Sequence, residues 1–484
     1  MPVNLQLTNI NINPKSLNYT GDDYVSMLKD TQGNIVKGHG RDFTVDLFLQ
    51  FNSANIAGVK NWIATKIAPL VTSGFNQLQA AQEFRSNGTD GGVFANFGLS
   101  ADGYRALGFS DNQLPNDPSY LRGAKNPAPK NALGLNDPPV SQWQAGFQGT
   151  IHAYLELAGD DQAALTAQAQ QIITGLTNIA TVVDQENGAV FRNDKGQVIE
   201  HFGFTDGVSQ PLFMADDIEA ARMNGGLDVY DPSAPLGTVL LKDPMGSANG
   251  YGSYFVYRKL AQNVAGFRAQ EAELATALGL SGDNAELAGA YIVGRFRDGT
   301  PVVSQPVEGW TNEPNNFNYD LDVDGLKCPF HAHTRKTNPR GDKVRQYGLA
   351  AGEDRMRRIA RRAVSYGPLD LNPPAGTEVG LLFLCAQSSI VDQFEFIQGI
   401  WANFTQFLEP NTGLDPVIGQ GAANDPVSPP APQQWPQNWG IPNSPPNAAP
   451  GPGGKKAFNF STWVTMMGGE YFFLPSISFL QTLQ

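Results

Sequence analysis

The chain of 484 residues is 41% apolar and 16% charged, which is enough for two or more domains that each bury a core. Its formal net charge of −13 at pH 7 argues against nucleic acid as a partner, because nucleic-acid binding relies on basic surfaces. No apolar run approaches the length that spans a bilayer, and the start MPVNLQLTNINI lacks the basic and apolar regions of a secretory signal. We therefore expect a soluble protein without a membrane partner, located by default in the cytoplasm.

Two cysteines, Cys328 and Cys385, are the only ones in the chain. They are too few for a disulfide framework or for a four-cysteine zinc or iron–sulfur site within one chain. The 52 glycines and 34 prolines indicate a protein rich in loops, since both residues favour turns.

The first predicted unit is the strand TVDLFLQF, residues 44–51, followed by a helix. Apolar residues spaced by three and four mark one face of this helix: Ile56, Val59, Ile63, Ile67 and Leu70. The segment TIHAYLELAGDDQAALTAQAQQI, from residue 150, is again an apolar strand, a polar turn and a helix. Two strand–helix units are thus predicted before residue 175.

The stretch HFGFTDGVSQP, residues 201–211, is predicted to be a loop that presents a carboxylate. Asp206 lies between Gly203 and Gly207, whose missing side chains would let the backbone approach a flat ligand closely. The neighbouring Phe204 makes the setting apolar. Asp-Gly is also a common turn, and neither a GxGxxG nor a Walker spacing is present, so Asp206 alone is weak evidence for a site.

The strand–helix scheme returns in the second half of the chain. SYFVYRKLAQNVAGF, from residue 253, repeats it, and Asn263-Val-Ala-Gly echoes Asn55-Ile-Ala-Gly. GLLFLCAQSSIVDQFEFIQGIW, from residue 380, is a further strand followed by a helix. Such repeats predict two α+β domains, each with an antiparallel sheet and helices on one face. Chance similarity of short amphipathic segments is the alternative.

The stretch CPFHAHTRKTNPR, residues 328–340, places His331 and His333 two residues apart. On a helix the two side chains point roughly 200° away from each other, and on a strand they share a face, but two ligands do not complete a closed metal site. No HExxH and no two-histidine, one-carboxylate spacing is visible. One axial bond to an iron porphyrin needs only one histidine. Ordinary structural histidines are the alternative.

The stretch DRMRRIARRAVSYG, residues 354–367, carries five arginines. If it forms a strand, Arg361 shares a face with Ile359 and Ala363 and is the arginine expected to point inward. A guanidinium in an apolar pocket is a fixed positive charge. A solvated basic face is the alternative, because it is the usual fate of a charge run.

Residues 421–455 lack periodicity and are rich in proline, which is typical of loops and linkers. The strand-like sequence YFFLPSISFL follows this segment. We therefore expect residues 421–455 to be an insertion within the second domain and not a disordered tail.

Three of these stretches together resemble the motifs of the dye-decolourising peroxidases, a family of haem peroxidases. GFTDG is similar to the family's GxxDG loop, CPFHAHTRKTNPR to its proximal segment CPFxAHxRxxNPR, and RRAVSYG to its distal-arginine strand RRxxxYG. NIVKGHGRD, GLLFLCAQ, FIQGIW, GLDPVIGQ and GGEYFFLPS match as well, so the resemblance covers nearly the whole chain. It is greatest to the longer subfamilies of fungi and cyanobacteria. The chain departs from the family's motifs at two places. The family usually has a residue other than histidine at the position of His331, and Ala363-Val364-Ser365 matches the distal strand less closely than the versions with glycine and proline do.

The resemblance implies an α+β fold of two ferredoxin-like domains, residues 1–215 and 216–484, with haem b bound between their antiparallel sheets. His333 would be the fifth ligand of the haem iron, and His331 would be a bystander that fills space. Asp415, in GLDPVIGQ, resembles the acidic partner of that histidine, and Glu395 is the alternative partner.

The resemblance also implies how the site would act on hydrogen peroxide. Asp206 would take the proton of the peroxide, and Arg361 would stabilise charge on the departing oxygen. Arg335, Asn338 and Arg340 are candidate partners of the haem propionates, since a guanidinium pairs well with a carboxylate. The remaining candidate contacts of the cofactor are Gly203, Phe204, Gly207, Leu381 and Phe383.

The expected reductants are dyes of the anthraquinone type, phenols and other aromatic compounds. Bulky dyes cannot reach a buried iron, so Trp401, which matches a tryptophan used in some relatives, is a candidate electron relay. A buried core tryptophan is the alternative. A homo-oligomer is left open. Two other functions also stay open: a haem-binding protein with little turnover, and a metal oxygenase that uses the His331 and His333 pair.

Overall fold

The computed structural model describes residues 3–8, 23–126, 135–227, 229–309, 315–350, 353–421, 432–437, 439–440 and 454–483. Among the described strands, eight close into a barrel in the order β8-β14-β2-β3-β1-β4-β10-β11, and β11 pairs with β8. Every pair around the barrel is antiparallel. The barrel strands are β1 (Phe43–Phe51), β2 (Phe94–Leu99), β3 (Ala153–Gly159), β4 (Ala180–Ala189), β8 (Tyr251–Gln262), β10 (Val364–Tyr366), β11 (Gly380–Gln387) and β14 (Val464–Leu474).

Short strands lie beside or outside the barrel. β7 (Leu241–Lys242) pairs with β8, and β9 (Ala360–Arg361) pairs with β11. β5 (Phe191–Arg192) pairs with β6 (Val198–Ile199), and β12 (Gln433–Pro436) pairs with β13 (Lys455–Phe458). β9 matters most for the site, because it carries Arg361.

Each half of the barrel has the strand order of a ferredoxin-like fold. The N-terminal half runs β4-β1-β3-β2 and the C-terminal half β14-β8-β11-β10, so both have the order fourth, first, third, second. The prediction of two ferredoxin-like α+β units is confirmed. The two sheets are not separate, however: β2 joins β14 and β4 joins β10. This closure gives hydrogen-bond partners to strands that would otherwise be open edges.

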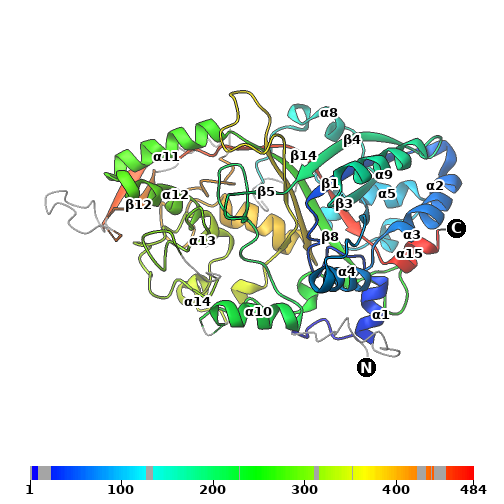
Figure 1. The fold of residues 1–484 in the computed structure, drawn as a ribbon, viewed down its shortest axis with the longest axis horizontal. Helices are drawn as coiled ribbons and strands as arrows, with labels where there is room; N and C mark the ends of the chain where they lie inside the picture. Colours follow the sequence, from blue (N-terminus) through cyan, green and yellow to red (C-terminus); the bar gives the residue numbers. More distant parts are fainter. Residues whose placement is uncertain are drawn as a thin grey trace.

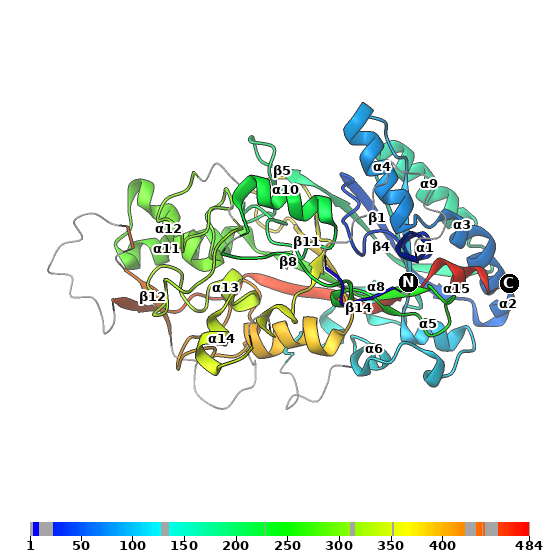
Figure 2. The same ribbon diagram turned by 90° about the horizontal axis from the view of Figure 1, so that it is seen from below.

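Helices lie outside the barrel, and several of them gather at the two ends of the molecule (Figures 1 and 2). The described helices are α1 (Asp23–Asp30), α2 (Ile56–Trp62), the π-helix η2 (Ile63–Ile67), α3 (Ala68–Leu70), α4 (Gly74–Asn87), α5 (Ala101–Ala106), α6 (Pro118–Arg122), α8 (Ala145–Gln148), α9 (Gln162–Thr174), α10 (Ala215–Gly225), α11 (Val264–Leu278), α12 (Glu286–Val293), α13 (His333–Thr337), α14 (Asp342–Tyr347), the π-helix η8 (Ile390–Ala402) and α15 (Ile477–Gln481). Single 3-10 turns are η1 (Ser53–Asn55), η3 (Asp111–Gln113), η4 (Val140–Gln142), η5 (Leu236–Thr238), η6 (Gly282–Ala285) and η7 (Glu353–Arg355). Helices α2, α3, α9 and α15 gather at one end, and α11, α12 and α13 gather at the other (Figures 1 and 2).

Asn55 and Asn263, the first residues of the two similar tetrapeptides, each cap the start of a helix. The Asn55 side chain accepts a hydrogen bond from Gly58 N at the start of α2, and Asn263 accepts one from Gly266 N at the start of α11. An asparagine at this position satisfies a backbone N–H that the helix leaves open. The repeated tetrapeptide therefore marks equivalent positions in the two halves.

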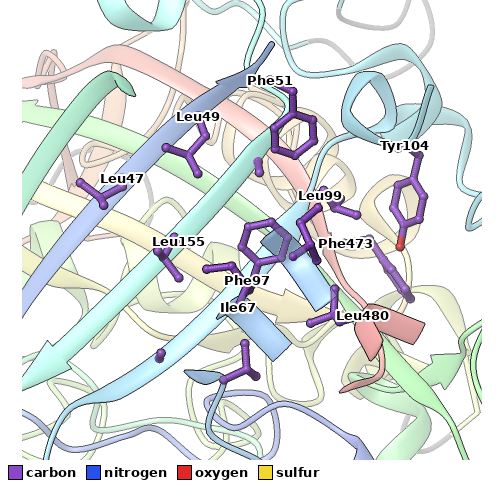
Figure 3. Close-up of a cluster of buried hydrophobic side chains, with 14 of the residues drawn as sticks. Leu47, Leu49, Phe51, Ile67, Phe97, Leu99, Tyr104, Leu155, Phe473 and Leu480 are labelled. Atoms are coloured by element: carbon purple, nitrogen blue, oxygen red, sulfur yellow. The ribbon is translucent and has the colours of Figure 1, made fainter. Parts of the chain in front are cut away.

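The N-terminal half-sheet buries its outer face against helices. The predicted helix over residues 56–70 forms as α2, η2 and α3, and its Val59, Ile63 and Ile67 are buried. Figure 3 shows Ile67 in one cluster with Leu155 of β3, Phe97 of β2 and the other labelled side chains. The periodicity in the sequence thus identified the face that packs on the sheet.

The barrel interior is a second core, formed by side chains that alternate with those of the outer face. It contains residues of both halves, among them Phe48 of β1, Tyr154 of β3, Tyr257 of β8, Leu382 of β11 and Phe472 of β14. The inner faces of the two half-sheets therefore pack directly on each other.

The division of the chain into two domains at residue 215 stays a prediction. Within the proline-rich segment 421–455, residues 422–431, 438 and 441–453 lie outside the described residues, whereas β12 and the first residue of β13 lie inside them. In the strand-like YFFLPSISFL that follows this segment, residues 471–474 end β14, whereas residues 477–480 lie in helix α15 (Ile477–Gln481). Among the described helices, none is long and apolar enough to cross a membrane.

Candidate active site

A cleft with about 1860 Å³ of empty space, its open mouth included, lies against the outer face of the C-terminal half-sheet. Leu381 and Phe383 of β11 line it, and they alternate with Leu382 and Leu384, which point into the barrel. The cleft therefore does not lie between the two half-sheets, but it is lined by residues of both predicted units, such as Asp206 and His333. The inner faces of the sheets are already packed on each other, so the open space lies outside the barrel.

η8, α13 and the loop that contains Asp206 also line the cleft. Phe394 and Ile397 of η8 and His333 of α13 line the cleft. Phe204 and Asp206 line it as well. The structure thus brings together residues from three stretches that lie far apart in the sequence.

Asp206 and Arg361 form an ion pair in the cleft. Nη1 of Arg361 donates to Oδ1 of Asp206 over 2.9 Å, and the side chains keep exposed fractions of 31% and 20%. The same Oδ1 accepts from Gly207 N over 2.7 Å. Among the described residues no donor to Oδ2 is found, so Oδ2 is the oxygen that remains to accept a proton.

Gln210 connects the Asp206 loop to the strand of Arg361. Its Oε1 accepts from Arg361 N over 3.0 Å, and its Nε2 donates to Arg361 O over 3.2 Å. Both backbone groups of Arg361 are thereby bound by one side chain. This amide fixes the distance between the two charged residues.

His333 begins α13 and is oriented by Asp415. Nδ1 of His333 lies 2.9 Å from Oδ2 of Asp415, which is fully buried. The other oxygen of Asp415 accepts from Val417 N and Ile418 N. Burial would raise the pKa of Asp415, but the charge and hydrogen bond of His333 and the two backbone donors hold that pKa below its ordinary value. Nε2 of His333 is then the ring nitrogen available to a ligand in the cleft.

Buried arginines make part of the cleft wall cationic. Burial, together with the neighbouring guanidinium of Arg340, lowers the pKa of Arg295 to about 9. Arg340 donates to Asn315 O, Phe317 O and the Ser209 hydroxyl, and among the described residues no carboxylate lies within 4.0 Å of it. Charge of this kind in a buried wall suits a ligand that carries carboxylates.

Arg335 does not line the cleft, contrary to its predicted role. Its side chain is fully buried, with Nε and Nη2 bonded to Asp342 and Nη1 bonded to Asp322 over 2.8 Å. A buried guanidinium needs such partners, and these two carboxylates supply them. Arg335 is therefore a residue of the fold.

The two glycines beside Asp206 shape its loop and do not line the cleft. Gly203 has φ +94° and Gly207 has φ +78°, in the region that favours glycine. Gly207 lines a neighbouring pocket with Lys37 and Arg362. Asn338 does line the cleft, and its Nδ2 donates to the Tyr230 hydroxyl over 3.1 Å.

Glu395 is excluded as the partner of His333. One carboxylate oxygen of Glu395 accepts from the Ser119 hydroxyl over 2.5 Å and the other from the Tyr471 hydroxyl over 2.9 Å. Asp415 alone, of the two acids considered, contacts the imidazole.

His331 and Trp401 lie in the interior, away from the cleft. The His331 ring contacts Trp435 edge-on, with centroids 4.2 Å apart, and burial lowers the pKa of His331 well below its ordinary value. Trp401 is 2% exposed, and the Lys343 ammonium lies 4.8 Å from its ring centroid. Since the two histidines do not share a cavity, they cannot share a metal. Within the described parts of the chain, no group of three or more His, Cys, Asp and Glu residues could hold a metal ion.

Several cleft residues were not predicted from the sequence. They are Glu200, Gln210, Tyr230, Arg258, Arg295 and Arg358. Two of them lie in stretches that the sequence analysis had already selected: Gln210 belongs to HFGFTDGVSQP, and Arg358 belongs to the run of five arginines. The others come from segments whose position depends on the whole fold.

Comparisons with known proteins agree with this geometry. Residues 30–192 match the family model described as the DyP dimeric alpha+beta barrel domain. The multifunctional dye peroxidase DyP2 of Amycolatopsis sp. is 41% identical over 501 residues, which cover 100% of both chains. A dye-decolorizing peroxidase of Mycetinis scorodonius, msp1, is 31% identical over 94% of this chain and 87% of that protein.

A solved structure agrees as well. The crystal structure of a DyP-type peroxidase of Anabaena sp. superposes with a TM-score of 0.90 at 44% identity and covers 100% of both chains. The similarity in sequence to DyP2 and in structure to the Anabaena peroxidase extends over the full length of the chain. The chain therefore belongs to the dye-decolourising peroxidase family and is a peroxidase.

Proposed function

We propose that the chain reduces hydrogen peroxide at a haem b held in this cleft by His333, and that it oxidises aromatic dyes and phenols. The observation that carries the proposal is that His333, Asp206 and Arg361 line one cleft and that each has an orienting partner. Peroxidases of this family are haem enzymes. The assignment of the roles to these residues of the chain is our inference.

The residues of the cleft fit a haem. With Nδ1 of His333 bonded to Asp415, Nε2 can bind iron and the ring is fixed in one orientation. Leu381 and Phe383 offer apolar contact to the macrocycle. Arg340 and Asn338 offer donors to its propionates, and Arg340 has no carboxylate partner of its own among the described residues.

A bound haem would supply the iron that takes oxidising equivalents from peroxide and passes them to the reductant. Asp206 accepts the proton of the peroxide at Oδ2, the oxygen that carries no other hydrogen bond in the described structure. Arg361 stabilises negative charge on the departing oxygen with a guanidinium that is already in place. Because the two side chains are bonded to each other, the proton acceptor and the charge stabiliser are held at one point of the cleft.

Asp415 would raise the electron density of His333 when this imidazole holds the iron. Its carboxylate accepts from Nδ1 of His333, which increases the basicity of Nε2 and favours the oxidised states of a bound iron. The lowered pKa of Asp415 keeps this acceptor ionised.

The proposed reductants follow from the relatives, which are named dye peroxidases. We propose aromatic dyes and phenols as the class of reductant. We also propose residues 1–215 and 216–484 as the two units, with the second unit carrying His333 and Arg361.

The experiment that tests the function is a haem titration of the purified protein, followed by rapid mixing with hydrogen peroxide. We expect a Soret band at one haem per chain and a spectral change that depends on peroxide concentration, followed by oxidation of an anthraquinone dye. A protein that binds haem but shows no fast response to peroxide would be a haem-binding protein with little turnover. Failure to bind haem would overturn the proposal.

A further inference from the structure

Lys336 is a buried lysine behind the proposed axial ligand, and the mechanism above does not use it. Its side chain has no exposed surface, and its Nζ donates to Ala402 O over 3.2 Å, Phe404 O over 2.9 Å and Gly413 O over 2.7 Å. Three accepting carbonyls match the three N–H groups of an ammonium, whereas a neutral amine has only two. The geometry therefore favours the charged form.

Lys336 and His333 act on the same segment of the chain. They lie three residues apart on α13, so both side chains project from one side of the helix. His333 contacts Asp415, and Lys336 binds the carbonyl of Gly413, two residues earlier. Ala402 O accepts from both Lys336 Nζ and Asp415 N, the latter over 2.9 Å. One carbonyl at the end of η8 therefore connects the lysine to the acid.

The charge of Lys336 is costly to bury and has a specific counter-charge. Burial lowers the pKa of Lys336 to about 7, and the attraction of Asp415 opposes this change. Asp415 is itself fully buried and ionised beside His333. Two opposite charges inside the protein stabilise each other more than they would in water. Removing one of them leaves the other without compensation.

We propose that Lys336 is a positioning residue for the axial histidine: its ammonium holds the segment that carries Asp415 and balances the charge of that carboxylate. This proposal rests on the proposed function, because it assumes that His333 binds the haem iron. It predicts that Lys336 sets the reduction potential of the iron through Asp415. A residue that only filled space would affect stability and leave the potential unchanged.

The test is the ferric to ferrous reduction potential of the haem-loaded protein, measured at pH 6. Lys336→Gln keeps a hydrogen-bond donor but removes the charge, so the ferrous state loses a stabilising cation. We expect the ferrous to ferric ratio at a fixed electrode potential to fall about tenfold, the scale of losing one buried unit charge in a medium of effective dielectric constant about 20. For a one-electron couple this is a shift of about 59 mV to lower potential. Asp415→Asn should shift the potential in the opposite direction, because it removes a negative charge.

Two control variants separate charge balance from damage to the fold. Lys336→Arg keeps the charge and the donors and should retain the wild-type potential. Lys343→Gln removes the same charge from α14, where the ammonium lies over the Trp401 ring, and should also leave the potential unchanged. The proposal is overturned if Lys336→Gln has the wild-type potential, if Lys343→Gln shifts it equally, or if Lys336→Arg shifts it.

The readout also distinguishes this proposal from the function on which it rests. If His333→Ala kept the same axial ligation, the proposed function would fail. If ligation required His333 but Lys336→Gln left the reduction potential unchanged, only the proposal about Lys336 would fail. Should Lys336→Gln not accumulate in a folded form, Lys336→Met, which also removes the charge, is measured in its place, and an unchanged potential in that variant would overturn the proposal.

Discussion

Nη1 of Arg361 donates to Oδ1 of Asp206 over 2.9 Å, although 155 residues separate them in the sequence. The pair is held from both sides. β9 fixes the backbone of Arg361 against β11, and Gln210 binds the same backbone from the Asp206 loop. Both charges are thus in place before peroxide enters, so the reaction needs no large rearrangement of side chains.

Arg361→Leu should slow the reaction with hydrogen peroxide by at least about a hundredfold, the scale of losing one preorganised charge-stabilising donor. Leucine keeps much of the volume and removes the positive charge. Stopped-flow mixing of the ferric protein with peroxide measures the bimolecular rate constant directly. Arg357→Leu is the matched control, because Arg357 belongs to the same run but bonds Asp392 at the surface. Equal rate constants for Arg361→Leu and wild type would move the role to another residue.

Asp206→Asn should also lower the peroxide rate constant, because an amide cannot take the proton that the carboxylate accepts. Stopped-flow mixing of each ferric variant with peroxide measures this rate constant. Asp217→Asn, which alters the ion pair with Lys37, is the control and should keep the wild-type rate constant. If Asp206→Asn reacted with peroxide at the wild-type rate, Asp206 would only shape the pocket.

Much of this site could be predicted from the sequence because its residues lie in short motifs. Asp206, Arg361 and His333 each sit within a stretch of fewer than 15 residues whose pattern is specific, and the structure places all three in one cleft. The ferredoxin-like units could be predicted for a related reason. Their helices and strands are each encoded locally by apolar periodicity, and the shared cap at Asn55 and Asn263 marks the repeat.

The position of the cleft and the partners of Arg335 could not be predicted in the same way. Closure of the barrel depends on pairing between strands that are far apart in the sequence, such as β2 with β14, and local patterns do not specify such pairs. Arg335 lies in the same motif as His333, but its role depends on Asp322 and Asp342, which come from segments without regular periodicity. Proximity in sequence to a ligand therefore did not imply proximity to the cleft.

His333→Ala should lose the haem or its axial ligation, whereas His331→Ala should keep both. The two histidines are two residues apart, but only His333 lines the cleft, and His331 packs on Trp435 in the interior. The Soret spectrum and the haem dissociation rate of the two variants measure the difference. His331→Ala is expected to lose stability, because a buried ring is removed and a cavity remains. Equal haem binding by both variants would contradict the assignment of the ligand.

The barrel interior also contains a row of acids, and Asp46 is its most strongly perturbed member. Asp46 of β1 lies opposite Glu156 of β3 and Glu186 of β4. Burial raises the pKa of Asp46 well above its ordinary value, Glu156 raises it further, and the hydrogen bond from the Tyr154 hydroxyl opposes the shift. Asp46 is therefore protonated in the folded protein at pH values where it would be ionised in the unfolded chain.

This shift makes the contribution of Asp46 to stability depend on pH in a direction that can be tested. A carboxyl group whose pKa is raised by folding contributes fully below its unfolded pKa of about 3.9, and the contribution is lost as the pH rises toward its folded pKa. Asp46→Asn does not ionise, so its stability relative to wild type should increase as the pH rises above about 4, by about 1.4 kcal/mol for each tenfold change in the ionisation constant. Urea unfolding at a series of pH values measures this. Asp42→Asn, which alters an exposed ion pair with Arg192, should show no such trend. A stability difference between Asp46→Asn and wild type that stayed constant with pH would mean that Asp46 has the same pKa in the folded and unfolded chains.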